Sequence, residues 1–119
     1  MAQPVVVALK VTLAPVGPEA AGLALKGCTA AILSANPATT THGSSVALSA
    51  NATCPGSPTY RFWAKAPGGS WTVIQDYSTS NTKSWTPTVA GTYSLEVDVR
   101  DQGSTDSYER VSNIQYGAT

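Results

Sequence analysis

The sequence predicts an antiparallel β-sandwich of about seven strands, and two patterns carry this prediction. From Thr92 to Arg100 apolar and polar residues alternate, which is typical of a strand with one buried face. Elsewhere, strand-like runs of about six residues are separated by turn signals every eight to twelve residues or so. A chain of 119 residues suits one domain with one hydrophobic core.

The N-terminal residues 1–27 differ from the rest of the chain, because they contain no aromatic residue. Val5–Leu13 alternates in part and is rich in β-branched residues, which favours a strand, whereas Pro15 and Pro18 break the pattern after Leu13. We therefore expect an anchoring or pairing segment (1–27) before a sandwich domain (28–119). This segment is expected to dock on its own sandwich or on a neighbouring chain through Val5, Val6, Val7, Leu9, Val11 and Leu13.

Three strands are expected in the first half of the sandwich domain. Thr29–Ser34 is a short apolar run that ends before Asn36-Pro37. Ser45–Cys54 has one apolar face and a second face whose residues are small and become polar. Thr59–Lys65 has large residues on both faces, which is typical of a strand in the middle of a sheet. Val46, Leu48 and Ala50 share one face of the former, and Tyr60, Phe62 and Ala64 share one face of the latter, opposite Arg61, Trp63 and Lys65.

The second half begins with the hairpin signal Pro67–Gly69, which leads into a strand over Trp71–Asp76. Residues 77–83 read as a polar loop. Ser84–Pro87 is a short strand with Trp85 pointing inward. After the alternating strand and a turn over 101–104, the last strand is expected within Asp106–Tyr116.

Composition excludes several function classes. Seven basic and seven acidic residues balance, so the chain lacks the basic stripe of a nucleic-acid-binding protein. No run approaches the roughly 18 apolar residues of a membrane helix, so membrane insertion is not expected. No secretory leader is legible, because Met1–Val7 has no basic residue before its apolar run and Pro4 interrupts it. The chain is expected either to avoid the standard export route or to have lost a leader.

The two cysteines, Cys28 and Cys54, leave no odd thiol. A bridge would close a loop of about 25 residues and would stabilise the protein by about 3 kcal/mol. Cys54-Pro55 lies in a Gly/Ser-rich turn, which favours an exposed, bridged position in an oxidising environment. The alternative is two buried free thiols.

Candidates for catalysis or metal binding are sparse. His42 is the single histidine and lies in a Thr/Gly/Ser loop without a neighbouring acid, so an exposed loop residue is expected rather than a catalytic one. The cysteine and histidine spacing matches no zinc site. Four acidic residues flank one hairpin and could gather around calcium, but no known calcium spacing is present; they are Asp98, Asp101, Asp106 and Glu109. No catalytic residue, metal or cofactor is expected.

Exposed aromatic rings could form a platform for a glycan, since sugars stack on such rings. Trp63 points away from Tyr60 and Phe62, which makes it a candidate together with Trp71 and Tyr77. Trp85 and Tyr108 are two further candidate rings. In a domain with one phenylalanine, the alternative is that the tryptophans belong to the core.

From residue 28 to residue 116 the sequence resembles bacterial Ig-like/fibronectin-type repeats related to the triple-tyrosine domain of secreted and surface proteins. The motifs that carry the resemblance are Cys54-Pro55, YRFW (60–63), PGGSWTVIQDYS (67–78), WTP (85–87), AGTY (90–93) and GSTDSYE (103–109). The resemblance implies an Ig-like sandwich, a Cys28–Cys54 bridge that staples a loop, and no enzymatic activity. Tyr93 also occupies the place of a tyrosine corner.

These observations favour a non-enzymatic structural or attachment module on an exterior surface, with assembly through the N-terminal segment by β-augmentation. Its partner would be another protein or a second copy. Two alternatives stay open: a decoration or structural protein of a phage virion, and a carbohydrate-binding module that uses exposed Trp and Tyr side chains. The expected location is extracellular, at the cell surface or on a virion surface.

Overall fold

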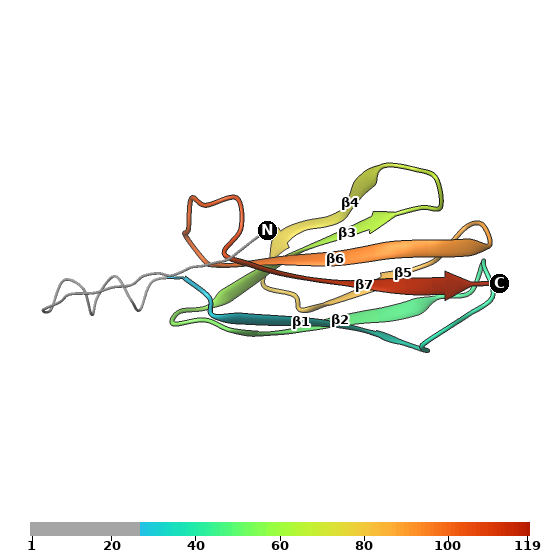
Figure 1. Cartoon of the computed structure of the whole chain (residues 1–119). Helices are drawn as coiled ribbons and strands as arrows, with labels where there is room; N and C mark the ends of the chain where they lie inside the picture. The colour runs from blue at the N-terminus through green and yellow to red at the C-terminus, as the bar shows by residue number, and fades with distance from the viewer. Residues whose placement is uncertain (1–26) are drawn as a thin grey trace, which may run out of the picture.

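Seven strands form two antiparallel sheets that pack face to face, as Figure 1 shows. The structure is a computed structural model and describes residues 27–119. One sheet has the order β1-β2-β5 and the other has the order β4-β3-β6-β7, so the predicted sandwich is confirmed. The strands are β1 (Ala30–Asn36), β2 (Val46–Thr53), β3 (Pro58–Lys65), β4 (Trp71–Ser78), β5 (Thr82–Trp85), β6 (Gly91–Asp101) and β7 (Arg110–Ala118).

The core lies between the sheets and is built from alternate residues of the strands. In β6, which pairs with both β3 and β7, Leu95 and Val97 are fully buried, and Phe62 of β3 lies opposite Val97. The predicted apolar face of β2 (Val46, Leu48, Ala50) is buried, and of the two faces predicted for β3 the one with Tyr60, Phe62 and Ala64 is buried. Trp85 of β5 points inward and contacts Tyr93 edge to face, with 5.0 Å between the ring centroids. Period-two alternation therefore identified the buried face of each central strand.

Several predicted strand ends were wrong, among them the end of β1, which continues to Asn36. Residues 77–83 are not all loop, since β4 continues through Tyr77 and Ser78, and β5 begins at Thr82. Tyr77 stays in the strand because its ring lies against the guanidinium groups of Arg61 and Arg100. The last strand, expected within Asp106–Tyr116, runs from Arg110 to Ala118 and so ends beyond the predicted range. Residues 102–109 before it form a loop that is held by hydrogen bonds to side chains of the sheet.

A tyrosine corner joins the start of β6 to the segment before it, as predicted for Tyr93. The Tyr93 hydroxyl donates to the carbonyl of Val89 (2.8 Å) and accepts from the backbone N–H groups of Thr88 (3.1 Å) and Val89 (3.0 Å). The ring itself is 3% exposed. One buried side chain thus satisfies three backbone groups of the turn that leads into the central strand.

Replacing Tyr93 with phenylalanine is expected to lower the free energy of unfolding by about 1–2 kcal/mol, because the backbone groups of the turn lose their partner while the ring packing is kept. The urea midpoint measures this loss. Tyr108→Phe is the matched control, since that ring is 46% exposed and its change is expected to stay within about 0.5 kcal/mol. Equal midpoints for the two variants would contradict the structural role of the Tyr93 hydroxyl.

The predicted pairing segment Val5–Leu13 lies outside the described residues. Within residues 27–119 there is no helix long and apolar enough to cross a membrane.

Candidate functional site

The outer face of the four-stranded sheet carries a cluster of charged and aromatic side chains. Arg61 of β3 lies opposite Asp98 of β6 in the strand register. Its Nη2 donates to Asp98 Oδ2 (3.0 Å), and Trp63 Nε1 donates to the same oxygen (2.9 Å). The Asp98 side chain is 3% exposed, so this carboxylate is buried although it lies on the outer face. A buried carboxylate needs such donors to compensate for the loss of water.

Aromatic rings cover the charged pair and connect it to the loop between β6 and β7. The Arg61 guanidinium carbon lies 5.0 Å from the ring centre of Trp63 and 4.6 Å from that of Tyr77. The Tyr77 hydroxyl donates to the carbonyl of Ser107 (2.6 Å), and Arg100 Nη1 donates to that of Asp106 (2.6 Å). These cation–π and hydrogen-bond contacts fix the loop against the sheet.

Two atoms of the pair, Arg61 Nε and Asp98 Oδ1, are buried without a hydrogen-bond partner among the described residues. Glu96 lies two residues before Asp98 and accepts from Asn113 Nδ2 (3.1 Å). Burial, and then the neighbouring Asp98 carboxylate, raise the pKa of Glu96 from 4.5 to about 7. A protonated Glu96 can donate to Asp98, which needs a further donor. Burial also raises the pKa of Tyr77 to about 12 and keeps its hydroxyl a donor.

The stability of the protein should therefore depend on the charge of Glu96. Because the folded state holds the Glu96 proton more tightly, this stabilisation is fully present below about pH 4.5 and is lost as the pH rises through about 7. We expect a loss of about 1 kcal/mol over that range, since the side chain is partly exposed and screened.

Glu96→Gln, which keeps a neutral side chain at every pH, is expected to remove this part of the pH dependence. Urea midpoints between pH 4.5 and 8 measure the effect for both proteins. Parallel curves for the wild type and the variant would show that Glu96 does not titrate near neutral pH.

The predicted glycan platform is divided between two environments. Trp63 and Tyr77 are half-buried, and both are engaged with Arg61. Trp71 is 40% exposed and begins β4, opposite Lys65. The structure thus brings Trp63 and Tyr77 together around Arg61 and presents Trp71 to solvent. Of the two further candidate rings, Trp85 lies in the core, and Tyr108 is exposed in the 102–109 loop.

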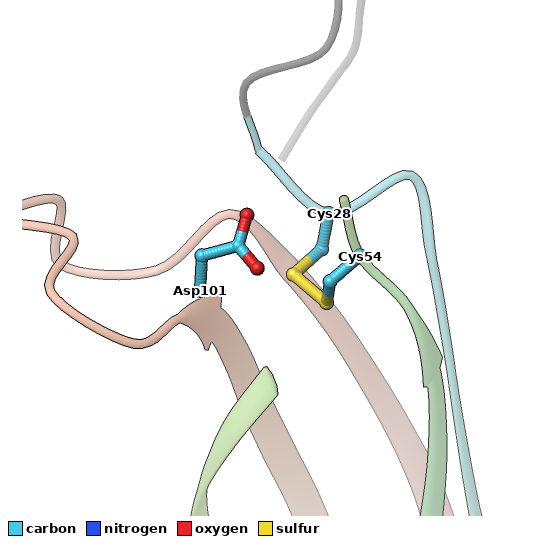
Figure 2. A group of neighbouring side chains, drawn as sticks. All are labelled: Cys28, Cys54 and Asp101. Carbon is cyan, nitrogen blue, oxygen red and sulfur yellow. A yellow bond between two sulfur atoms is a disulfide. The ribbon is translucent and has the colours of Figure 1, made fainter. Parts of the chain in front are cut away.

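The second group of predicted residues lies at the end of the sandwich where β1 begins. Cys28 and Cys54 form a disulfide between the residues that flank β1 and β2, and Figure 2 shows it beside Asp101. Cys54, for which the Cys-Pro turn predicted an exposed position, is partly buried, and Cys28 is only 2% exposed. The reason is that Glu109 reaches over this end and accepts from the Cys28 N–H (3.0 Å).

Cys28, Cys54 and Asp101 do not form a metal-binding site. The sulfur atoms and an Asp101 carboxylate oxygen lie within 4.8 Å of one another, but cysteines joined in a disulfide offer no thiolate for a metal. Of the four acidic residues that could have gathered around calcium, Asp98 is turned to the outer face, away from the others. Asp101, Asp106 and Glu109 line a hollow of about 640 Å³.

The carboxylates of Asp101 and Glu109 in this hollow accept hydrogen bonds from donors of the protein itself. Asp101 Oδ1 accepts from the Gly56 N–H (3.0 Å). Glu109 Oε1 accepts from the N–H of Asp101 (3.0 Å), and its Oε2 accepts from Ser104 (2.8 Å). This arrangement ties the 102–109 loop to the disulfide end of the sandwich. His42 is exposed elsewhere, where its Nδ1 lies 2.9 Å from the carbonyl of Thr119.

The protein is a β-sandwich module. Its sheets carry a disulfide and a tyrosine corner, and the polar side chains of its outer face bond mainly to one another. The model of the Y_Y_Y domain family matches residues 51–116, which is more than half of the chain. The chain therefore belongs to the Y_Y_Y (triple tyrosine) domain family, whose domain has no catalytic role of its own. The match begins within β2 and leaves β1 and Cys28 outside it. A comparison with curated proteins found no match.

The sequence prediction named Trp63 and Tyr77 of the outer-face cluster but missed the role of its charged residues. Asp98 was predicted only as a possible calcium ligand, and Arg61 and Glu96 were not singled out. A signal was present, because strand alternation places Arg61 and Trp63 on one face of β3 and Asp98 on one face of β6. The strand pairing that brings these faces together is visible only in the structure.

Proposed function

We propose that the protein is a non-enzymatic structural and attachment module of an exterior surface, and that its N-terminal segment connects it to a partner protein or to a second copy. The observation that carries this proposal is that Cys28, which directly follows the N-terminal segment, is bonded to two parts of the sandwich. Cys28 is buried, bonded covalently to Cys54, and hydrogen-bonded to Glu109. Because the N-terminal segment ends just before this residue, a force on the segment would act on the disulfide and would not detach β1 from its sheet.

Two further features support the proposal. The charged and aromatic groups of the outer face bond mainly to one another, which suits a rigid scaffold. The disulfide indicates an oxidising environment, which fits a secreted or cell-surface protein. A structural or decoration protein on a phage virion is the alternative setting for the same role.

The proposal is tested by comparing the full chain with residues 27–119, the part that forms the sandwich. Multi-angle light scattering at physiological salt gives the mass of each in solution. We expect the full chain to assemble, or to bind a partner protein, while residues 27–119 form a folded monomer. The proposed role of the segment would be contradicted if the full chain neither assembled nor bound a partner protein and behaved like residues 27–119.

A carbohydrate-binding module is the second candidate, and the exposure of Trp71 supports it. A ring that is 40% exposed on an outer face can stack against a sugar. Co-sedimentation with insoluble cellulose, chitin and xylan tests this candidate. Binding that is lost in Trp71→Ala and kept in Tyr108→Ala would support it, and no binding to any of the three would count against it.

A further inference from the structure

The two sheets have four edge strands, β1, β5, β4 and β7, and these differ in whether another strand covers them. β1 and β7 lie beside each other where the two sheets meet, and the N–H of Leu33 in β1 donates to Ser112 Oγ in β7 (3.0 Å). Near the end of the same seam, Tyr116 donates to the carbonyl of Pro37 (2.6 Å). Among the described residues two edges are left, and β5 has only four residues. The eight-residue β4 is therefore the long open edge.

The first part of β4 has the properties of a strand that can accept another strand. Trp71, Thr72 and Val73 are all exposed, and Val73 is 41% exposed. Proteins usually guard such an edge with charges, prolines or bulges. β4 contains no proline, and its single charged residue is Asp76. The two register shifts in its pairing with β3 both lie after Val73, and Ile74 packs against the core. The stretch from Trp71 to Val73 is left unguarded.

The sequence of the chain contains a strand candidate that complements this edge. Val5–Leu13 has nine residues, close to the eight of β4, and is rich in β-branched and apolar residues. Its single charged residue is Lys10, whereas that of β4 is Asp76, whose side chain is 80% exposed. The two stretches therefore match in length and carry opposite charges.

The point where the N-terminal segment joins the sandwich favours pairing between molecules. Gly27 lies beside Glu109, next to the start of β7, which is the opposite edge of the sheet from β4. Thirteen residues (14–26) separate Leu13 from Gly27. They can span about 40 Å when extended, which is enough to reach a neighbouring sandwich.

We propose that β4 is the acceptor edge for assembly and that Val5–Leu13 of a second copy adds to it as a fifth strand of the four-stranded sheet. The inference rests on the proposed role of the N-terminal segment and names the surface that receives it. Backbone hydrogen bonds would provide most of the affinity, and Trp71 and Val73 would pack against the apolar side chains of the added strand.

The test uses the full chain with one lysine placed on either open edge. Val73→Lys lies on β4, and Thr82→Lys, on the exposed β5 edge, is the matched control. Light scattering over a range of protein concentrations gives the dissociation constant of each protein. We expect Val73→Lys, and equally Val7→Lys in the segment, to raise this constant at least about tenfold, while Thr82→Lys leaves it unchanged. Amide hydrogen exchange of Trp71–Val73 should slow as the wild-type concentration rises.

Each other outcome overturns the acceptor assignment in a recognisable way. If the full chain assembles and Val7→Lys prevents it, but Val73→Lys does not, the segment pairs elsewhere and the proposed function stands. If Trp71–Val73 are more protected in a full-chain monomer at all concentrations than in residues 27–119, the segment occupies the edge of its own chain. If the full chain is monomeric and these amides exchange freely, the chain does not self-assemble, and the segment would have to bind a different protein.

Discussion

Replacing Asp98 with alanine is expected to lower the free energy of unfolding by about 3 kcal/mol. Asp98 is 2% exposed, and its carboxylate accepts from both Arg61 and Trp63. Removing it leaves the Trp63 N–H without an acceptor and the Arg61 guanidinium, whose side chain is only 22% exposed, without its counterion. Removing one partner of a buried pair typically costs about 3–5 kcal/mol. The lower end applies here because Arg61 can still reach some solvent. Urea denaturation at pH 7 measures the loss.

The chain provides its own control, because Arg61 has a second carboxylate neighbour. Asp76 lies 3.9 Å from Arg61 Nη1, and its side chain is 80% exposed. Asp76→Ala is expected to change the stability by less than about 0.5 kcal/mol, since exposed ion pairs contribute little. A similar cost for the two alanine variants would show that burial does not determine the importance of Asp98.

A double variant separates two free energies: the cost of leaving Arg61 unpaired and the net contribution of the Arg61–Asp98 ion pair to stability. Arg61→Met together with Asp98→Leu should lose less stability than Asp98→Ala alone, because no unpaired charge is left in the cluster. The Trp63 N–H would still lack its acceptor in this variant. If the double variant is the less stable one, the ion pair itself contributes more than its desolvation costs.

Removing the disulfide, as Cys28→Ser with Cys54→Ser, is expected to lower the free energy of unfolding by about 3 kcal/mol. The bridge joins residues 26 positions apart, and it stabilises the protein mainly by limiting the freedom of the unfolded chain. The urea midpoint of the double variant, compared with that of the oxidised wild type, measures the effect.

Reduced wild-type protein is the control for the disulfide, because it lacks the bond but keeps both sulfur atoms. Its midpoint should fall with that of the serine variant. Since Cys28 is 2% exposed, a thiol reagent should reduce the native protein slowly and the urea-unfolded protein rapidly. Unchanged midpoints after loss of the bond would mean that packing alone holds β1 in place.

Strand alternation was sufficient to predict most of the fold. The pattern in Thr92–Arg100 identified β6 and its buried residues, and the mixed faces of Thr59–Lys65 correctly placed β3 inside a sheet. The resemblance to the triple-tyrosine domain supplied the Cys28–Cys54 bridge and the expectation of no activity. The ends of strands were harder to predict. Tyr77 looked like part of a polar loop, but contacts with Arg61 and Arg100 extend β4 through it.

The sequence by itself determined which side chains of the central strands share one face, because side chains alternate between the two faces of any strand. Only the tertiary structure decided what happens on the outer face. Asp98 has the sequence position of a solvent-exposed residue, yet Arg61 and Trp63 of β3 bond to it and bury it. The open edge of β4 was equally invisible, since strand order depends on contacts between residues far apart in the chain. Local patterns set the face of a residue, and long-range pairing sets its environment.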